Sequence, residues 1–159
     1  MYFAEITAAD DTQLAEIIRY NLKNHGLDVP GTVYFDKNLY HLSDFYREEG
    51  KKRFYYILKD DDGTVLGGIG LAEFECFEDC TELQKLYLAD SVKGAGLGYK
   101  LLSLIEDKAR ELGYKRAYLE THTNLEAAIH MYEKIGYKRI EKPEGVVHAT
   151  MNRFYIKEL

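Results

Sequence analysis

Apolar residues recur at three- and four-residue intervals in four parts of the chain, which is the spacing of one face of an α-helix. The four stripes are Leu14, Ile17, Ile18 and Leu22; Leu39, Leu42, Phe45 and Tyr46; Leu97, Leu101, Leu104, Ile105, Ala109 and Leu112; and Leu125, Ala128, Ile129 and Tyr132. Gly26, Gly50, Gly113 and Gly136 follow the stripes, in the position where glycine commonly ends a helix. We therefore expect four helices, the last of them capped by Asn124.

Between these stripes, short runs rich in aromatic and β-branched residues predict strands. The runs cover residues 2–6, 54–58, 65–74, 81–88, 117–120, 137–140 and 151–156. A turn at 60–63 joins the second and third runs as a hairpin, and the helix that follows the fourth run requires parallel pairing with the fifth. Gly67, Gly68 and Gly70 mark a twist or a close approach. This order predicts an α/β (α+β) protein, with a mixed central sheet of about six to seven strands flanked by four helices, and residues 1–159 as a single domain.

A glycine-rich loop separates the strand at 81–88 from the next helix. It reads Lys93-Gly94-Ala95-Gly96-Leu97-Gly98-Tyr99. Glycine leaves backbone N–H groups uncovered and the helix adds the positive end of its dipole, so the loop suits a phosphate or pyrophosphate. It is not a dinucleotide fingerprint, because Tyr99 stands where the third glycine belongs, and it lacks the Gly-Lys-Ser/Thr of a Walker A loop. For this loop alone, a simple strand-to-helix turn is the alternative.

The run Lys93–Gly98 resembles motif A of the GNAT superfamily of acyl-CoA N-acyltransferases, (Gln/Arg)-x-x-Gly-x-(Gly/Ala). Lys93 stands where the family usually has Gln or Arg. A lysine keeps the positive charge of an arginine but lacks its planar guanidinium, which can bind a phosphate through two parallel hydrogen bonds. Residues 124–137 resemble motif B of the same family, and the positions that match are Ala128-Ile129, Tyr132-Glu133-Lys134 and Gly136-Tyr137. Asn124 stands one residue earlier than in the family pattern. The motifs come in the family's order, and the predicted elements extend the resemblance over nearly the whole chain.

The resemblance implies a GNAT-type fold and direct transfer of an acetyl group from acetyl-CoA to a primary amine, on a small molecule or a peptide terminus. In this family the loop amides bind the pyrophosphate of CoA, while the adjoining strand pairs with the pantetheine arm through its backbone and steadies the thioester oxygen. The cofactor-binding residues so implied are Leu86, Tyr87, Leu88, Lys93, Gly94, Ala95, Gly96, Leu97, Gly98, Tyr99 and Asn124.

The catalytic residues are also implied by the resemblance. An alkyl amine titrates near pH 10, so it must lose a proton before it attacks a thioester. Glu82 and Glu120 both stand where family members carry the base, and the alternative for each is a solvated strand end. Tyr132 occupies the family's place for the acid that protonates the CoA thiolate, with a packing role on the apolar stripe as its alternative.

Composition and charge limit the kinds of partner that the chain is expected to bind. The net charge is -6, which argues against a nucleic-acid partner and slightly favours a cationic acceptor. The N-terminus has no signal-peptide pattern and no apolar run is long enough to span a bilayer, so we expect a cytoplasmic protein without a membrane partner. Cys76 and Cys80 form a lone pair, and no histidine–carboxylate cluster predicts a metal site. We assign no catalytic or binding role to His122 or His130.

Two other functions compete with the acetyltransferase. A non-catalytic acyl-CoA-binding sensor would keep the loop and lose turnover, and a binder of nucleotides or dinucleotides would use the same loop for other phosphates. Thiol release from acetyl-CoA distinguishes the first, and stabilisation by CoA but not by NAD or ATP distinguishes the second. By analogy with the superfamily, a homodimer is also possible.

Overall fold

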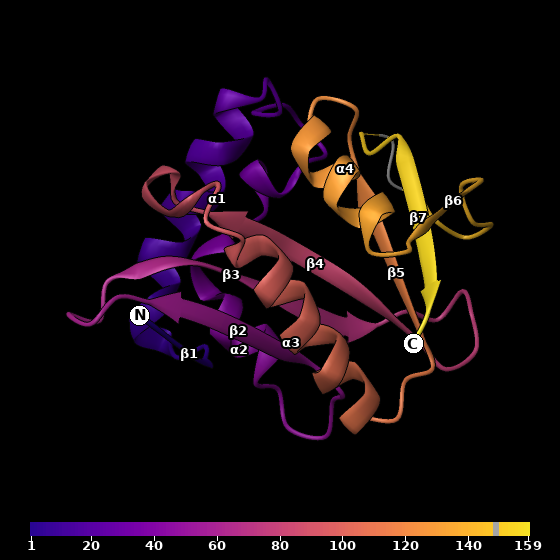
Figure 1. Cartoon of the computed structure of the whole chain (residues 1–159), viewed down its shortest axis with the longest axis horizontal. Helices are drawn as coiled ribbons and strands as arrows, with labels where there is room; N and C mark the ends of the chain where they lie inside the picture. Colours follow the sequence, from indigo (N-terminus) through magenta and orange to yellow (C-terminus); the bar gives the residue numbers. More distant parts are fainter. Residues whose placement is uncertain (148–149) are drawn as a thin grey trace.

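A computed structural model of the chain describes residues 1–147 and 150–159, which form one mixed sheet with helices on both faces (Figure 1). The elements are β1 (Tyr2–Glu5), α1 (Asp11–Asn24), α2 (Leu42–Tyr46), β2 (Phe54–Lys59), β3 (Val65–Glu73), β4 (Cys80–Leu88), α3 (Leu97–Glu111), β5 (Arg116–Thr121), α4 (Glu126–Lys134), β6 (Lys138–Ile140) and β7 (Arg153–Glu158). Within these two ranges, no helix is both long enough and apolar enough to cross a membrane.

The seven strands lie in the order β1-β2-β3-β4-β5-β7-β6. β4 and β5 are parallel, whereas each other neighbouring pair is antiparallel. The hairpin of β2 and β3 and the crossover through α3 are therefore confirmed, as is the mixed α/β class. Parallel pairing of β4 and β5 places the ends of both strands at the same edge of the sheet.

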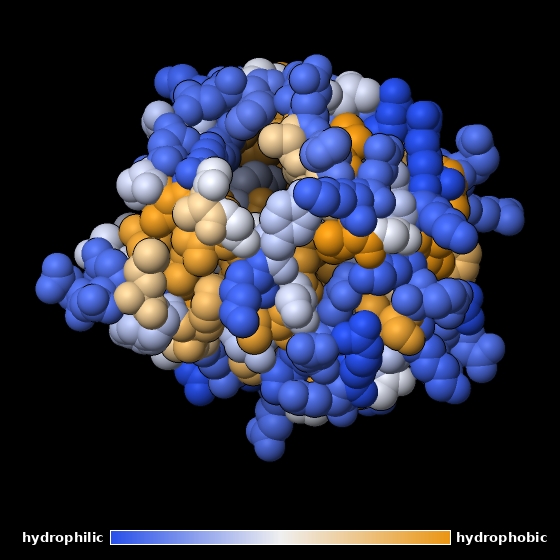
Figure 2. All heavy atoms as spheres, viewed as in Figure 1, coloured by the Kyte–Doolittle hydropathy of each residue, from blue (hydrophilic) through white to orange (hydrophobic). Residues whose placement is uncertain are grey.

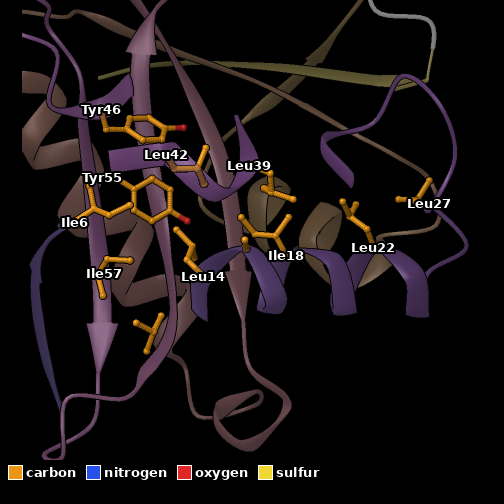
Figure 3. Close-up of a cluster of buried hydrophobic side chains, with 12 residues drawn as sticks. Ile6, Leu14, Ile18, Leu22, Leu27, Leu39, Leu42, Tyr46, Tyr55 and Ile57 are labelled. Atoms are coloured by element: carbon orange, nitrogen blue, oxygen red, sulfur yellow. The ribbon is translucent and has the colours of Figure 1, made fainter. Parts of the chain in front are cut away.

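The helices divide between the two faces of the sheet. On one face, Leu14, Ile18 and Leu22 of α1 pack in a cluster with Tyr55 and Ile57 of β2 (Figure 3). On the other face, α3 and α4 cover a second cluster, which contains Leu101, Leu102, Ile105, Ile69, Leu71, Leu119 and Tyr132. A ligand that passes through the sheet between its strands would therefore connect the α1–α2 side with the α3–α4 side.

The second helix is much shorter than predicted. The stripe from Leu39 to Tyr46 forms a 3₁₀ turn over Leu39–His41 followed by α2, and the helix does not continue to Gly50. Asp11, at the start of α1, accepts hydrogen bonds from the backbone N–H and the hydroxyl of Ser43 at 2.8 and 2.6 Å. A side chain distant in sequence therefore satisfies a free N–H of the first turn of α2, which the local pattern does not reveal.

The glycines of β3 mark a close approach, as the sequence suggests. A Cβ on Gly68 would lie 2.3 Å from the carbonyl oxygen of Tyr56 and 2.4 Å from Cε1 of the Tyr55 ring. Gly68→Ala is expected to lower the free energy of unfolding by about 3 kcal/mol, because a packed interior has no room for the added methyl. Denaturant unfolding measures the change.

Gly63→Ala, in the turn between β2 and β3, is the control for this prediction. Gly63 has a φ of +84°, and a Cβ added there would meet nothing within 4 Å, so its substitution introduces only the left-handed strain of about 1 kcal/mol. Equal losses in the two variants would show that the β2–β3 interior accommodates the methyl group.

Candidate active site

The sheet opens where β4 and β5 part. The two strands are paired from Cys80–Arg116 to Leu83–Leu119, and there the ladder ends, although β4 continues to Leu88 (Figure 1). Within the described residues, the β5-facing edge of β4 from Gln84 onward therefore has no strand partner. Its unused N–H and C=O groups can pair with an extended ligand.

A β-bulge in β4 accounts for the divergence. Gly68 pairs with Tyr87 and Gly70 with Gln84, so β4 carries one residue more than β3 between these pairs. Lys85, inside the bulge, has a φ of +53°, which is uncommon for a residue other than glycine. The hydroxyl of Tyr55 donates a 2.7 Å hydrogen bond to the Lys85 carbonyl. Because a bulge bends its strand, β4 turns away from β5 at this point.

Two adjoining cavities lie at the opening. The larger has a volume of about 450 Å³ and is walled by the loop from Gly31 to Asp36. The smaller has a volume of about 60 Å³ and reaches Leu125 and Tyr132 on the α4 side. Residues that line both cavities are Leu83, Gln84, Lys85, Tyr87, Glu120 and Met151. Figure 2 shows the molecule hollowed between α1 and α4, with both hydrophilic and more apolar side chains around the mouth.

Tyr132 is a largely buried residue that lines the smaller cavity. Its side chain is only 8% exposed, and its ring packs edge-on against Tyr137 at 6.0 Å between centroids. Among the described residues its hydroxyl has no hydrogen-bond partner, whereas the hydroxyls of Tyr137 and Tyr155 donate to Glu106 and Glu133. Burial, and secondarily the neighbouring Tyr87, raises the pKa of Tyr132. The group is therefore a protonated donor at neutral pH.

The two glutamates predicted as candidate bases differ in the cavities that they line and in their hydrogen-bond partners. Glu120 lines both cavities, whereas Glu82 lines only the larger one. The hydroxyl of Tyr118 donates a 3.0 Å hydrogen bond to Glu120, and the Tyr118 ring is stacked on Phe74. Glu82 accepts a hydrogen bond from the side-chain amide of Gln84 at 3.1 Å. The structure thus brings Glu120 and Tyr132 to the same cavity, and Glu82 to the adjoining one.

The glycines of the loop between β4 and α3 serve two different purposes. Gly94 and Gly96 have φ values of +79° and +75°, and a Cβ on either would meet nothing within 4 Å, so the space in front of them is open. Gly98 is instead a packing position, because its Cβ would lie 2.9 Å from Sδ of Met131 in α4. The first-turn N–H groups of α3 have no acceptor within the helix. The loop therefore offers free donors at the positive end of a helix.

Two of the predicted cofactor contacts already have protein partners. Nζ of Lys93 lies 2.5 Å from a carboxylate oxygen of Asp90, so a phosphate would compete with that carboxylate. The carbonyl of Leu88 accepts a 3.0 Å hydrogen bond from the side chain of Asn21 in α1. The predicted residues Leu86 and Tyr87 line the smaller cavity, and Ala95, Leu97 and Tyr99 lie in the loop and first turn of α3.

Asn124 does not cap α4, so that prediction is wrong. The residue before the helix is Leu125, and no side chain caps it. The Asn124 side chain instead donates a 2.9 Å hydrogen bond to the carbonyl of His25, just beyond α1. This bond ties the end of α1 to the start of α4 and leaves the side-chain oxygen of Asn124 for another donor.

Comparison with known proteins identifies the family. Residues 8–137 match the model described as the acetyltransferase (GNAT) family. The chain belongs to the GNAT family. It is 36% identical to the N-acetyltransferase YjgM of Escherichia coli (strain K12), over 97% of this chain and 92% of the relative. This GNAT chain is therefore an acyltransferase enzyme.

Solved GNAT structures share the fold. An acetyltransferase of the GNAT family from Staphylococcus aureus Mu50 superposes with a TM-score of 0.85 at 19% identity, covering 99% of this chain and 98% of that one. A phosphinothricin acetyltransferase from Sinorhizobium meliloti, in complex with acetyl-CoA, has a TM-score of 0.78 at 20% identity, covering 99% of this chain and 88% of that one. An aminoglycoside 6'-N-acetyltransferase in complex with coenzyme A also shares the fold, with a TM-score of 0.71 at 17% identity, covering 99% of this chain and 97% of that one.

The sequence interpretation missed part of the GNAT cavity wall. Lys85, Gln84 and Met151 line both cavities. A signal existed for Lys85, since this charged residue directly precedes the apolar strand end Leu86, Tyr87 and Leu88. The loop from Gly31 to Asp36 was not missed, because the sequence predicts that the loop before the second helix suits one wall of a pocket, and this loop lines the larger cavity.

Proposed function

We propose that this enzyme transfers an acetyl group directly from acetyl-CoA to a primary amine on a small molecule or a peptide terminus, with residues 1–159 acting as one domain. The observation that carries this proposal is that Glu120 and Tyr132 line the same cavity at the point where β4 parts from β5. A base and an acid at one cavity match the two proton transfers that the reaction needs.

In the proposed complex, acetyl-CoA lies on the α3–α4 side of the opening. The loop amides from Gly94 to Tyr99 bind the pyrophosphate, supported by the open space in front of Gly94 and Gly96. The edge of β4 at Leu86 and Leu88, which has no strand partner among the described residues, pairs with the pantetheine arm as an added strand, although Asn21 already bonds to the Leu88 carbonyl. A backbone N–H of the same edge stabilises the thioester oxygen as negative charge develops.

The acceptor enters through the larger cavity on the opposite side. Glu120 removes a proton from the ammonium of the acceptor, either directly or through water, and the free amine attacks the thioester carbonyl carbon. The nitrogen of the tetrahedral intermediate still carries one proton too many for an amide. As the C–S bond breaks, the thiolate of CoA takes the proton of the Tyr132 hydroxyl, and the extra proton on nitrogen passes through water to the Tyr132 oxygen, which leaves a neutral amide and restores the acid. Glu82 is the second candidate for the base, and the hydrogen bond from Tyr118 orients Glu120.

Ligand-dependent melting tests the cofactor, and thiol release tests turnover. CoA at about 100 times its Kd should stabilise the protein by about 2.7 kcal/mol, while NAD and ATP should not. Acetyl-CoA with a panel of primary amines should release free thiol. Stabilisation by CoA without thiol release from any amine would indicate the acyl-CoA sensor instead.

Gly94→Ala tests the loop. The added Cβ enters the space where the pyrophosphate is proposed to lie, so the Kd for CoA is expected to rise about tenfold, equivalent to about 1.4 kcal/mol. Isothermal titration calorimetry measures it. Gly113→Ala, beyond the end of α3, is the matched control, because its φ of +89° and open surroundings give the same strain away from the site. If both variants bind CoA like the unaltered protein, the loop does not hold the pyrophosphate.

A further inference from the structure

Lys85 is the one lysine or arginine among the described residues that line the two cavities. Its ammonium has no ion pair and no hydrogen bond within the described part of the chain, and it lies over the ring of Tyr46, with 5.7 Å between Nζ and the ring centroid. Most lysines of a folded protein keep their charge in open water. An unpaired ammonium at the wall of a cavity is therefore available to a ligand.

The backbone of Lys85 is held in an unfavourable state. The residue combines a φ of +53° with its position inside the bulge, and the Tyr55 hydroxyl fixes its carbonyl at 2.7 Å. Burial lowers the pKa of the Lys85 ammonium, and the nearby carboxylates of Asp36 and Glu82 oppose this shift. Desolvation disfavours the charged form of the side chain, and an anionic group bound beside it would offset that desolvation.

We propose that Lys85 is a specificity-determining residue that binds a carboxylate of the acceptor, and that the acceptor is a small zwitterion of the amino-acid type. The inference rests on the proposed function. Asp36, Glu82 and Glu120 line the same larger cavity, so the acceptor ammonium meets carboxylates while its carboxylate meets Lys85. Oppositely charged groups in one cavity of about 450 Å³ match a molecule that carries both charges.

This assignment differs from the one that overall charge suggests. The net charge of -6 favours a polycation, but a second ammonium placed near Lys85 would be repelled by it. Charge distant from the cavity is screened by salt, whereas the groups that line the cavity act at short range. The cavity lining therefore offers carboxylates for the acceptor ammonium and the Lys85 ammonium for the acceptor carboxylate, which overall charge does not reveal.

Paired acceptors test the proposal through thiol release from acetyl-CoA. Alanine, leucine and phenylalanine are each compared with the amine that lacks the carboxylate: ethylamine, isopentylamine and phenethylamine. Putrescine and spermidine represent polycations. We expect at least one amino acid to exceed its decarboxylated partner in kcat/KM by about 30-fold, the size expected of one charged interaction. Lys85→Met should abolish that ratio by raising KM for the amino acid.

Three further variants test whether the preference depends on the positive charge of Lys85. Lys85→Arg should keep the preference, Lys85→Gln should lose it as Lys85→Met does, and Lys115→Met should leave it unchanged, since the Lys115 side chain is 76% exposed. Retained stabilisation by CoA shows that each variant is folded. If either Lys85→Met or Lys85→Gln fails to fold, the other neutral variant is compared with the wild-type protein, again through the ratio of kcat/KM for the amino acid to kcat/KM for its decarboxylated partner.

The outcomes separate the inference from the proposed function. Equal activity on amino acids and their decarboxylated partners, a preference for putrescine or spermidine, or a ratio that survives in both neutral variants overturns the role of Lys85, while continued thiol release leaves the acetyltransferase proposal standing. Absence of thiol release with every amine overturns both.

Discussion

Tyr132→Phe is expected to lower kcat about 100-fold, with KM for acetyl-CoA nearly unchanged. The variant removes only the hydroxyl, and within the described residues that hydroxyl bonds to no protein group, so the fold loses no hydrogen bond there. The ring remains to fill its place in the α4 packing. Because burial raises the pKa of Tyr132, the acid stays protonated beyond its ordinary range, and the wild-type kcat should show no alkaline decline below about pH 10. Steady-state thiol release measures both effects.

Tyr137→Phe provides a matched control for this variant. The Tyr137 hydroxyl donates a buried 3.0 Å hydrogen bond to Glu106, so its loss should reduce the free energy of unfolding by about 2 kcal/mol while kcat is retained. The two substitutions therefore separate turnover from stability. A Tyr132→Phe enzyme with wild-type kcat would mean that another group protonates the thiolate.

Glu120→Gln is expected to lower kcat/KM for the amine about 100-fold at pH 7 and to regain activity as the pH rises. Without the base, only acceptor molecules that are already deprotonated react, and their fraction increases about tenfold per pH unit below the amine pKa. The pH profile of kcat/KM therefore carries the signature of a lost base, which a merely structural defect would not produce.

Glu82→Gln distinguishes the two candidate bases. Glu82 lines only the larger cavity, so its substitution should reduce activity less and without recovery at high pH. The reverse pattern would transfer the role of base to Glu82. If neither variant loses activity at pH 7, the acceptor amine loses its proton before it enters the site.

Much of the fold followed from local pattern. Apolar spacing located the helices, the turn set the pairing of β2 with β3, and the crossover through α3 set the pairing of β4 with β5. The shortened α2 could not be predicted, because its start depends on Asp11 of another helix. The same holds for Asn124, whose partner His25 is 99 residues away. Each failure concerns a polar side chain that bonds across the fold.

The sequence by itself determined the family, the glycine-rich loop and the residue types available for proton transfer, because these depend on short runs of neighbouring residues. Only the tertiary structure decided that Glu120 and Tyr132 line one cavity and that Lys85 stands at its wall. The bulge that turns β4 away from β5 lies where Gly68, Tyr55 and Lys85 meet from three strands. Contacts between strands open this site, and no local pattern encodes them.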